Sequence, residues 1–195
     1  MLPWLVVGLG NPGPTYAGHR HNVGFGVVEE LASRTGARFS SARPIKAEVA
    51  ESRLGPPGTA DAPRLLLSKS RTYMNETGGP VSGLLRYHKI TVDRLVVVHD
   101  ELDIDPGQLR VKFGGGDNGH NGLRSIRASL GTGDYYRVRV GVGRPPGRQD
   151  PADYLLSNFA ARDRESLAVE IVRAADAVES LVTAGLERTQ SAFNS

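Results

Sequence analysis

The stretch WLVVGLGNPGP at residues 4–14 is an apolar run that ends in a loop of glycine and proline. The run reads as a strand, and residues 8–13 carry the spacing G-x-G-x-x-G that is typical of dinucleotide-binding turns. Such a turn must lead directly into a helix, whereas Pro12 and Pro14 disfavour helical angles at the residues before them. The next helix is predicted only near Val23. The stretch therefore predicts the first strand of an α/β sheet, followed by a polar loop in place of a dinucleotide site.

Strand and helix patterns alternate along the rest of the chain, which favours an α/β sandwich. We predict a single domain over residues 1–195, with a central, largely parallel mixed sheet that is flanked by helices. Strands are predicted at residues 2–8, 47–54, 64–68, 95–98, 109–113 and 136–142. Helices are predicted at residues 23–35, 80–88, 121–130 and 162–183. Residues 55–63, rich in proline and glycine, are predicted to form an exposed loop between two strands.

The composition excludes several classes of protein. The chain has 195 residues and no cysteine, so it can bury a sizeable core but cannot form a disulfide, a thiolate zinc site or a cysteine nucleophile. The first residues lack a basic segment followed by an apolar run, and no stretch reaches membrane-spanning length. We therefore expect a soluble, cytoplasmic protein. The net charge of +3, with 24 Lys and Arg, allows a nucleic-acid partner without requiring one.

Polar side chains follow the ends of several predicted strands. Asn11 and His21 follow the first strand, and Asn75 and Asp100 follow two later ones. A glycine-rich segment that leads to Asn121 connects a further strand to a helix. Because active sites of open α/β sheets collect at the carboxyl ends of the strands, we expect these side chains to converge.

These residue types suit hydrolysis by water. An imidazole such as that of His21, with an unperturbed pKa of about 6.5, can take a proton from water at physiological pH. A carboxylate such as that of Asp100 can fix the tautomer of the imidazole and stabilise its cation. Asparagine amides can orient a carbonyl and support an oxyanion. No serine lies in a G-x-S-x-G turn, which favours direct attack by water over an acyl-enzyme.

Each of these residues also has a purely structural interpretation. Asn75 and Asn121 are suitable helix N-caps, and a lone histidine after a loop, such as His21, is more often a helix cap or a structural hydrogen-bonding group than a base. The glycine-rich segment is compatible with a flexible turn. The functional interpretation depends on their joint position at the ends of elements.

Five ordered blocks of this sequence resemble those of bacterial peptidyl-tRNA hydrolases, and the resemblance spans about residues 4–188. The blocks are Gly8-Leu9-Gly10-Asn11-Pro12-Gly13, Arg20-His21-Asn22-Val23-Gly24, Thr72-Tyr73-Met74-Asn75-Glu76-Thr77-Gly78, His99-Asp100-Glu101-Leu102-Asp103 and Gly119-His120-Asn121-Gly122-Leu123-Arg124-Ser125. Two positions depart from the family pattern: His19 stands where threonine is usual, and Ser70 where proline is frequent. Neither is a catalytic position, so we expect only local changes of the loops.

The resemblance implies hydrolysis of the ester between a peptide and the 3′-terminal ribose of tRNA, which recycles tRNA from peptidyl-tRNA. It implies that His21 is the general base, that Asp100 orients it, and that Asn11 distinguishes N-blocked peptidyl-tRNA from free aminoacyl-tRNA. The residues implied to bind tRNA or the peptide end are Tyr16, Tyr73, Asn75, Asn121, Lys112 and Arg139. No metal or cofactor is implied, and we expect a monomer.

The two basic residues of this set also have support from the sequence pattern. Lys112 precedes the glycine-rich segment, whose backbone N–H groups could form an anion-binding nest. Arg139 and Arg137 share one face of a strand, because strand side chains alternate. The resemblance implies that Lys112 and Arg139 bind the 5′-phosphate of tRNA. A solvated basic face is the structural alternative.

Three other functions compete with this interpretation. A metal-dependent hydrolase would draw ligands from His19, His21, His99, Asp100 and His120, but their spacing matches no known zinc pattern. A non-catalytic RNA-binding module would not require His21. A dinucleotide-dependent enzyme would have to bind a nicotinamide or a flavin.

Overall fold

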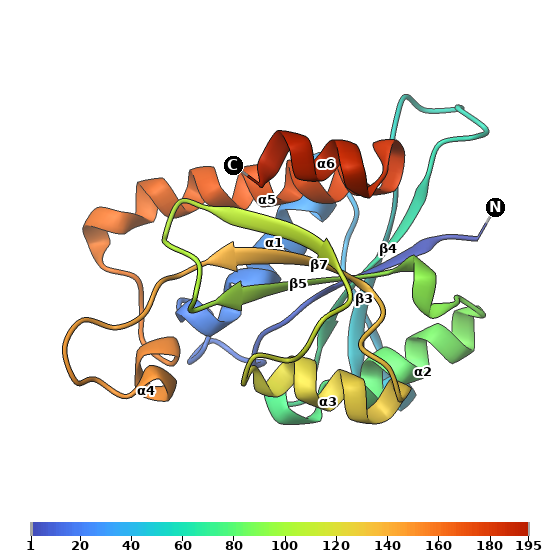
Figure 1. Ribbon diagram of the computed structural model, residues 1–195. Helices are drawn as coiled ribbons and strands as arrows, with labels where there is room; N and C mark the ends of the chain where they lie inside the picture. Colours follow the sequence, from blue (N-terminus) through green and yellow to red (C-terminus); the bar gives the residue numbers. More distant parts are fainter. Residues whose placement is uncertain (1, 195) are drawn as a thin grey trace.

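The computed structural model describes residues 2–194 and confirms the predicted α/β architecture (Figure 1). Within these residues, one seven-stranded sheet has the order β2-β3-β4-β1-β5-β7-β6; β4, β1, β5 and β7 run parallel, and β2, β3 and β6 pair antiparallel. The strands are β1 (Trp4–Gly8), β2 (Ser40–Ala42), β3 (Ala47–Arg53), β4 (Arg64–Ser70), β5 (Leu95–Glu101), β6 (Leu109–Phe113) and β7 (Tyr136–Gly141). The α-helices are α1 (Val23–Thr35), α2 (Gly78–His88), α3 (Asn121–Leu130), α4 (Pro151–Leu155), α5 (Arg164–Ala184) and α6 (Leu186–Phe193).

Helices cover both faces of the sheet. α1, α5 and α6 lie on one face, and α2 and α3 lie on the other (Figure 1). Strand alternation directs Val6 and Val98 into the apolar cluster under α1 and α5, and Leu5 and Val97 into the cluster under α2 and α3. Because both faces are buried, the central strands are apolar at nearly every position, as in parallel sheets generally.

Most predicted elements form within a few residues of their expected ends. α1 begins and ends as predicted, and Gly36 closes it in the left-handed conformation with φ 68°. β5 continues to Glu101, three residues beyond the predicted end at Val98. The polar residues after the apolar run are therefore held in the ladder with β7 instead of in a loop.

Three short elements escaped prediction. β2 has only three residues, all polar or small, so it carries no apolar alternation. α4 is a single short helix whose N-cap Asp150 accepts a hydrogen bond from the N–H of Ala152. α6 begins immediately after Gly185, beyond the last predicted helix at residues 162–183. It is held by tertiary contacts: the Asn194 side chain that follows it binds both the N–H and the C=O of Val111 on β6.

The glycines of the first loop serve close packing between α1 and the sheet. A Cβ atom on Gly8 would lie 2.2 Å from the carbonyl oxygen of Gly24, and one on Gly24 would lie 2.4 Å from that of Val98. Only glycine permits this approach of α1 to the ends of β1 and β5. Gly8, the first glycine of the G-x-G-x-x-G spacing, thus has a structural explanation without a bound pyrophosphate.

The end of β1 is the point where the chain changes face. The chain leaves β1 for α1 on one face, whereas it leaves the neighbouring β4 for α2 on the other. In open α/β sheets such a switch point leaves a crevice at the carboxyl ends of the strands, where ligands bind. The loops after β1, β4, β5 and β6 all reach this end of the sheet or its border.

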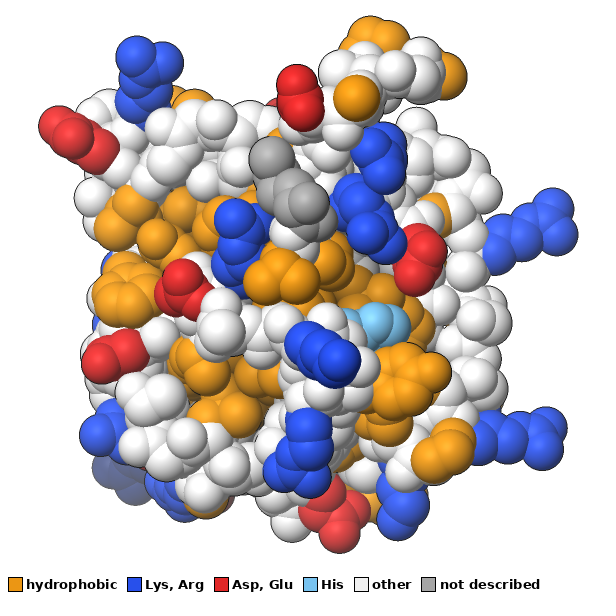
Figure 2. All heavy atoms as spheres, turned by 90° about the vertical axis from the view of Figure 1, so that its right-hand side faces the viewer, with side chains coloured by type: hydrophobic (Ala, Val, Ile, Leu, Met, Phe, Trp, Pro, Cys, Tyr) orange, Lys and Arg blue, Asp and Glu red, His pale blue; other side chains and the backbone are white. Residues whose placement is uncertain are grey.

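The opposite end of the molecule has a mixed surface. Figure 2 looks onto the end at which the parallel strands begin, and there basic side chains lie among acidic and apolar ones. Between residues 2 and 194, no helix combines the length and the apolar character that a membrane span requires.

Candidate active site

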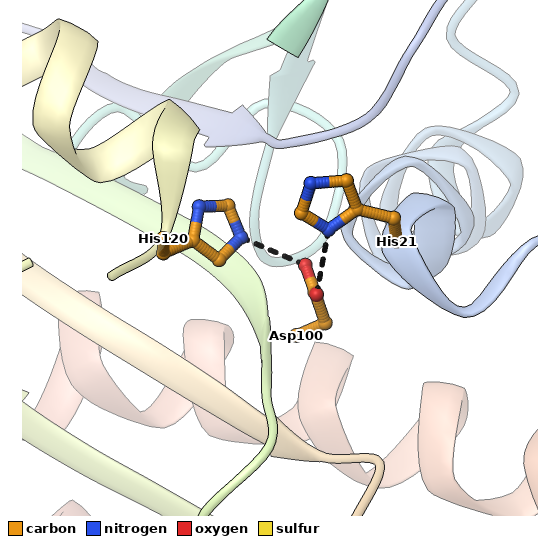
Figure 3. A group of neighbouring side chains, drawn as sticks. All are labelled: His21, Asp100 and His120. Atoms are coloured by element: carbon orange, nitrogen blue, oxygen red, sulfur yellow. Dashed lines mark hydrogen bonds and ion pairs between the residues drawn. The ribbon is translucent and has the colours of Figure 1, made fainter. Parts of the chain in front are cut away.

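Two imidazoles and one carboxylate meet at the switch point (Figure 3). His21 lies in a 3-10 turn (Arg20–Asn22) before α1, Asp100 lies near the end of β5, and His120 is the N-cap of α3. His21 Nδ1 lies 2.7 Å from Asp100 Oδ2, and His120 Nε2 lies 2.9 Å from Asp100 Oδ1. The Asp100 side chain is fully buried and both imidazoles are largely buried. One carboxylate therefore holds two imidazoles.

The hydrogen bonds determine the tautomers of both rings. His120 Nδ1 accepts hydrogen bonds from the backbone N–H groups of Gly122 (3.1 Å) and Leu123 (3.4 Å), so its proton is on Nε2, which donates to Asp100. An ionised carboxylate only accepts, so His21 donates from Nδ1. The Nε2 atom of His21 then carries a lone pair that can accept a proton.

Asp100 stays ionised in this buried position. Burial by itself raises the pKa of a carboxyl, but the charges of His120 and His21 and their hydrogen bonds outweigh burial and hold the pKa of Asp100 well below its usual range. His99, the preceding residue, stays neutral because complete burial and the charge of His120 lower its pKa to about 3. The site thus has one fixed negative charge beside two imidazoles.

Asn11 is anchored so that one atom of its side chain is left for a ligand. Its backbone N–H donates to Asn22 Oδ1 (2.9 Å), its C=O accepts from Asn22 Nδ2 (2.8 Å), and its side-chain Oδ1 accepts from the N–H of Met74 (2.7 Å). Among the residues that the structure describes, none accepts from Asn11 Nδ2. The amide therefore presents a donor to the site.

A cavity of about 310 Å³ joins these groups to three further residues of the predicted set. Asn75 and Asn121 line it together with Asn11, His21 and Tyr73, and α4 closes one side with apolar residues. Its lining residues are Asn11, His21, Tyr73, Met74, Asn75, Leu102, Gly119, His120, Asn121, Pro151, Ala152, Leu155 and Leu156. The site thus has the imidazole, the amides and an apolar wall around one space.

Tyr16 lies at the border of this cavity, beside Tyr73. The two rings meet edge to face with centroids 6.0 Å apart, and the Tyr73 side chain is 56% exposed. The departures from the family pattern affect these two loops. His19 packs its ring against Tyr16, and Ser70 Oγ accepts from the N–H of Thr72, just before Tyr73. Both replacements thus have local roles and leave the imidazole and carboxylate contacts untouched.

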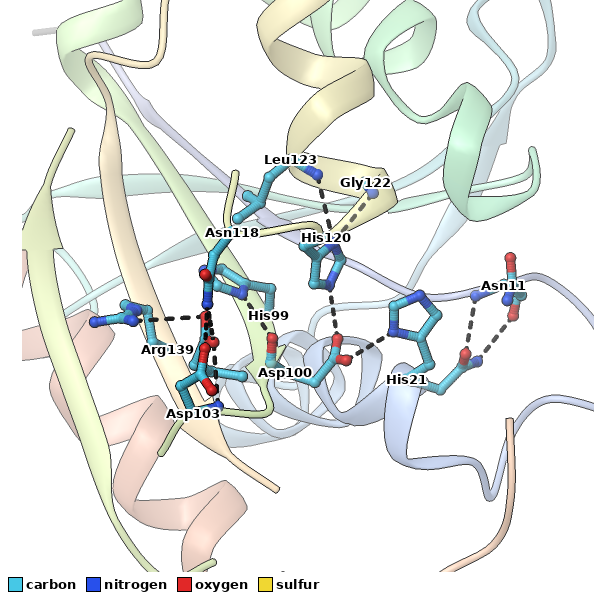
Figure 4. Close-up of polar contacts among 12 residues, drawn as sticks. Asn11, His21, His99, Asp100, Asp103, Asn118, His120, Gly122, Leu123 and Arg139 are labelled. Carbon is cyan, nitrogen blue, oxygen red and sulfur yellow. Dashed lines mark hydrogen bonds and ion pairs between the residues drawn. The ribbon is translucent and has the colours of Figure 1, made fainter. Parts of the chain in front are cut away.

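The two predicted phosphate-binding residues lie on the neighbouring strands β6 and β7. Arg139 Nη2 is 3.6 Å from Glu101 Oε2, and the Lys112 ammonium lies against Gly115, where a Cβ atom would come within 2.6 Å of Nζ. Burial and the charges of Arg139 and Arg137 lower the pKa of Lys112. In Figure 4 Arg139 lies on the opposite side of Asp100 from His21.

Arg137 has a different role from its neighbour on β7. It is buried, and its guanidinium donates to the carbonyl oxygens of Gly115 (2.7 Å), Gly116 and Gly133 (3.0 Å). It therefore shapes the glycine-rich loop from inside, although it shares the predicted strand face with Arg139.

The sequence does not predict the roles of two residues, His120 and Arg20, in this site. We had considered His120 only as a possible metal ligand, although a histidine before a predicted helix could have indicated an N-cap. The second is Arg20, whose Nη1 donates to Ser157 Oγ (2.7 Å) and to the C=O of Asn158 (2.8 Å), and whose guanidinium lies 4.1 Å from the ring centre of Tyr154. Arg20 thereby holds the segment around α4 beside the loop that carries His21.

The three central residues could also hold a metal ion by distance alone. The potential ligand atoms of His21, Asp100 and His120 all lie within 4.8 Å of one another. However, both Asp100 oxygens bind imidazole N–H groups, and the remaining nitrogen of His120 caps α3. His19 and His99 do not join this group: His19 contacts Tyr16, and His99 binds the backbone carbonyl of Asp100. Hydrogen bonding thus accounts for the geometry.

Comparisons with known proteins agree with one another. A family model described as peptidyl-tRNA hydrolase matches residues 5–195. A peptidyl-tRNA hydrolase of Streptomyces coelicolor is 58% identical over 193 residues, which cover 99% of this chain and 96% of that protein. One of Cutibacterium acnes is 56% identical and covers 98% of each. The crystal structure of peptidyl-tRNA hydrolase from Acinetobacter baumannii superimposes with a TM-score of 0.84 at 33% identity, over 97% of this chain and 93% of that chain.

Proposed function

Because this chain belongs to the peptidyl-tRNA hydrolase family, we propose that His21, Asp100 and Asn11 carry the reaction of the family in this protein. The chain is an enzyme that hydrolyses the ester bond between a peptide and tRNA, which returns the tRNA for use. The observation that carries the residue assignment is the 2.7 Å bond from His21 Nδ1 to Asp100, which leaves Nε2 to act as a base.

The proposed reaction proceeds by direct attack of water. His21 Nε2 takes a proton from a water molecule while the oxygen of that water attacks the ester carbonyl. Asp100 stabilises the imidazolium of His21 that forms. Asn75 and Asn121, which line the same cavity, are the candidate donors to the oxyanion. Collapse of the tetrahedral intermediate breaks the bond to the ribose oxygen, which takes the proton back from His21. The products are the free peptide acid and a tRNA with its terminal hydroxyl restored.

His120 acts as a positioning residue in this scheme. It holds the second oxygen of Asp100, and its own ring is held by the first turn of α3. The orientation of the carboxylate toward His21 thus depends on a helix terminus.

Asn11 is proposed to select N-blocked substrates through its Nδ2 donor. A blocked amine offers a peptide carbonyl that can accept this hydrogen bond, whereas a free aminoacyl ester offers an ammonium group, which is also a donor. Two donors that face each other in a partly desolvated site leave both unpaired, which disfavours the free ester.

Asn11→Asp is expected to reduce the preference of the enzyme for N-blocked over free aminoacyl-tRNA. The carboxylate keeps an oxygen for the Met74 N–H and replaces the Nδ2 donor by an acceptor. We expect kcat/KM for N-acetylaminoacyl-tRNA to fall by the equivalent of about 1–3 kcal/mol, the penalty of one unsatisfied buried partner, while the unacetylated form loses nothing. The measurement is the ratio of the two specificity constants. Asn11→Ala removes both the Nδ2 donor and the oxygen that accepts from the Met74 N–H, so comparison with Asn11→Asp separates the two contributions. An equal fall for both substrates would show that Asn11 has a general structural or catalytic role.

Tyr16, Tyr73 and the two basic residues are proposed to bind the tRNA. The exposed ring of Tyr73 and the half-buried ring of Tyr16 beside it suit stacking with the bases of the 3′ end. Lys112 and Arg139, beside the glycine-rich loop, suit the 5′-phosphate. We also propose that the chain acts as a cytoplasmic monomer without a metal or cofactor, because the assigned residues of one chain supply the base, its orienting carboxylate and the binding contacts.

Lys112→Ala and Arg139→Ala are expected to weaken tRNA binding rather than chemistry. Each lost phosphate contact should lower the slope of log affinity against log salt by about one. The measurement is tRNA affinity as a function of salt, with Arg86→Ala on the exposed side of α2 as a charge-matched control. Slopes equal to the wild-type value in both variants would place the 5′-phosphate elsewhere.

A further inference from the structure

Glu101 is a buried carboxylate directly beside the proposed phosphate-binding arginine. Its side chain is 5% exposed, and Oε2 lies 3.6 Å from Arg139 Nη2. This distance is longer than the roughly 2.7–2.9 Å of a direct charge-assisted hydrogen bond, so the pair attracts without a tight bond. Arg139 has no second ion pair within residues 2–194, which leaves its other N–H groups for a ligand.

Hydrogen bonds hold the Glu101 carboxylate beside the arginine. Its other oxygen, Oε1, accepts from Asn118 Nδ2 (2.7 Å) and from the N–H of Asp103 (3.3 Å). Asn118 is itself held in the left-handed conformation with φ 48° and also binds Asp103 Oδ2 at 2.7 Å (Figure 4). A ligand at Arg139 must therefore bind with the charge of Glu101 still in place.

Glu101 acts on the second cation of this site as well. Its charge raises the pKa of Lys112, against the burial and the arginine charges that together lower it. Lys112 makes no ion pair of its own among the described residues. A single carboxylate thus partly neutralises both cations that would face a phosphate.

We propose that Glu101 is a built-in counter-ion that weakens binding of the tRNA 5′-phosphate and so sets how strongly the enzyme distinguishes 5′-phosphorylated from unphosphorylated tRNA ends. This inference rests on the assignment of Lys112 and Arg139 to the 5′-phosphate. A phosphate at Arg139 faces the repulsion of Glu101, whereas a 5′-hydroxyl does not. Weaker phosphate binding in turn favours release of the product tRNA.

Glu101→Gln is the direct test, because glutamine keeps an oxygen for Asn118 and the Asp103 N–H while it removes the charge. Deacylated tRNA with a 5′-phosphate and the same tRNA with a 5′-hydroxyl are titrated into one protein preparation, so the ratio of the two dissociation constants does not depend on the folded fraction. We expect the variant to bind the phosphorylated tRNA about three- to tenfold more tightly, with unchanged affinity for the hydroxyl form. Asp103→Asn removes a charge from the same polar network and leaves the 3.6 Å Glu101–Arg139 pair in place; because Asp103 acts on Arg139 only weakly and without a direct ion pair, this variant should change the ratio less than about twofold.

A preference for the phosphorylated tRNA that is unchanged or smaller in Glu101→Gln would overturn the inference. A smaller preference would mean that Glu101 holds Arg139 in its binding position. Lys112→Ala and Arg139→Ala, measured with the same two ligands, separate this failure from a wrong phosphate assignment. If both leave the preference at the wild-type value, the phosphate lies elsewhere. If they reduce it while Glu101→Gln does not raise it, only the role of Glu101 is wrong.

Discussion

Asp100→Asn is expected to lower kcat by up to about 10⁴-fold while the fold stays intact, by analogy with the orienting carboxylate of serine hydrolases. The structure explains why an amide fails here. His120 must donate from Nε2, because its Nδ1 caps α3, so the amide oxygen of the substituted side chain would face His120. The amide NH₂ would then face His21 Nδ1 and force it to accept. The proton of His21 would move to Nε2, and the base would be lost.

This explanation leads to a second variant that should recover part of the loss. In Asp100→Asn with His120→Ala, the amide can turn its oxygen toward His21 and restore the reactive tautomer. Loss of the His120 cap should reduce stability by about 0.5–2 kcal/mol, so turnover is measured well below the melting temperature of the double variant. The assay is release of peptide from N-acetylaminoacyl-tRNA under saturating substrate. Turnover at the wild-type level in Asp100→Asn would contradict the orienting role of the carboxylate.

His21→Ala is expected to reduce kcat by about 10²- to 10⁴-fold, the usual contribution of a general base, with tRNA affinity retained. Retention is expected because most of the residues proposed to bind tRNA lie on other elements, with Lys112 on β6, Arg139 on β7 and Tyr73 after β4. The paired measurements are single-turnover hydrolysis and the dissociation constant for deacylated tRNA. His88→Ala at the end of α2, remote from the cavity, is the matched control and should hydrolyse at the wild-type rate.

The outcome of His21→Ala also separates the enzyme from a binding module. Equal hydrolysis in wild type and His21→Ala would exclude His21 as the base. A loss of tRNA binding in parallel with hydrolysis would instead assign His21 to substrate binding.

Much of the fold could be predicted because the spacing of apolar residues along each strand and helix matches the faces of that element that are buried. The continuous apolar runs of β1 and β5 reflect strands covered on both faces, and the spacing of Val23, Val27, Val28 and Leu31 reflects one buried stripe of α1. Polar residues that follow such strands must lie at the same edge if the strands are parallel. That geometry allowed His21, Asp100 and Asn11 to be selected together, and the ordered motifs supplied the family.

Contacts that depend on how elements pack could not be predicted in this way. The bond between His21 and Asp100 spans 79 residues and that between His120 and Asp100 spans 20, and no periodicity indicates which ring atom meets which oxygen. The same holds for neighbours of identical type: Arg137 is buried under the glycine-rich loop, while Arg139 faces Glu101.

The sequence by itself determined the fold class, the edge of the sheet that carries the site, and most of the residues that meet there. Side-chain type and period are local properties, and they suffice to say which face is buried and where a polar loop emerges. Only the tertiary structure decided that His120 holds the second oxygen of Asp100, that Asn11 offers a donor, and that Glu101 partly neutralises Arg139. These are directional contacts of a few ångströms between separate elements, so they depend on the final packing of β5, β7 and α3 rather than on any pattern within one of them.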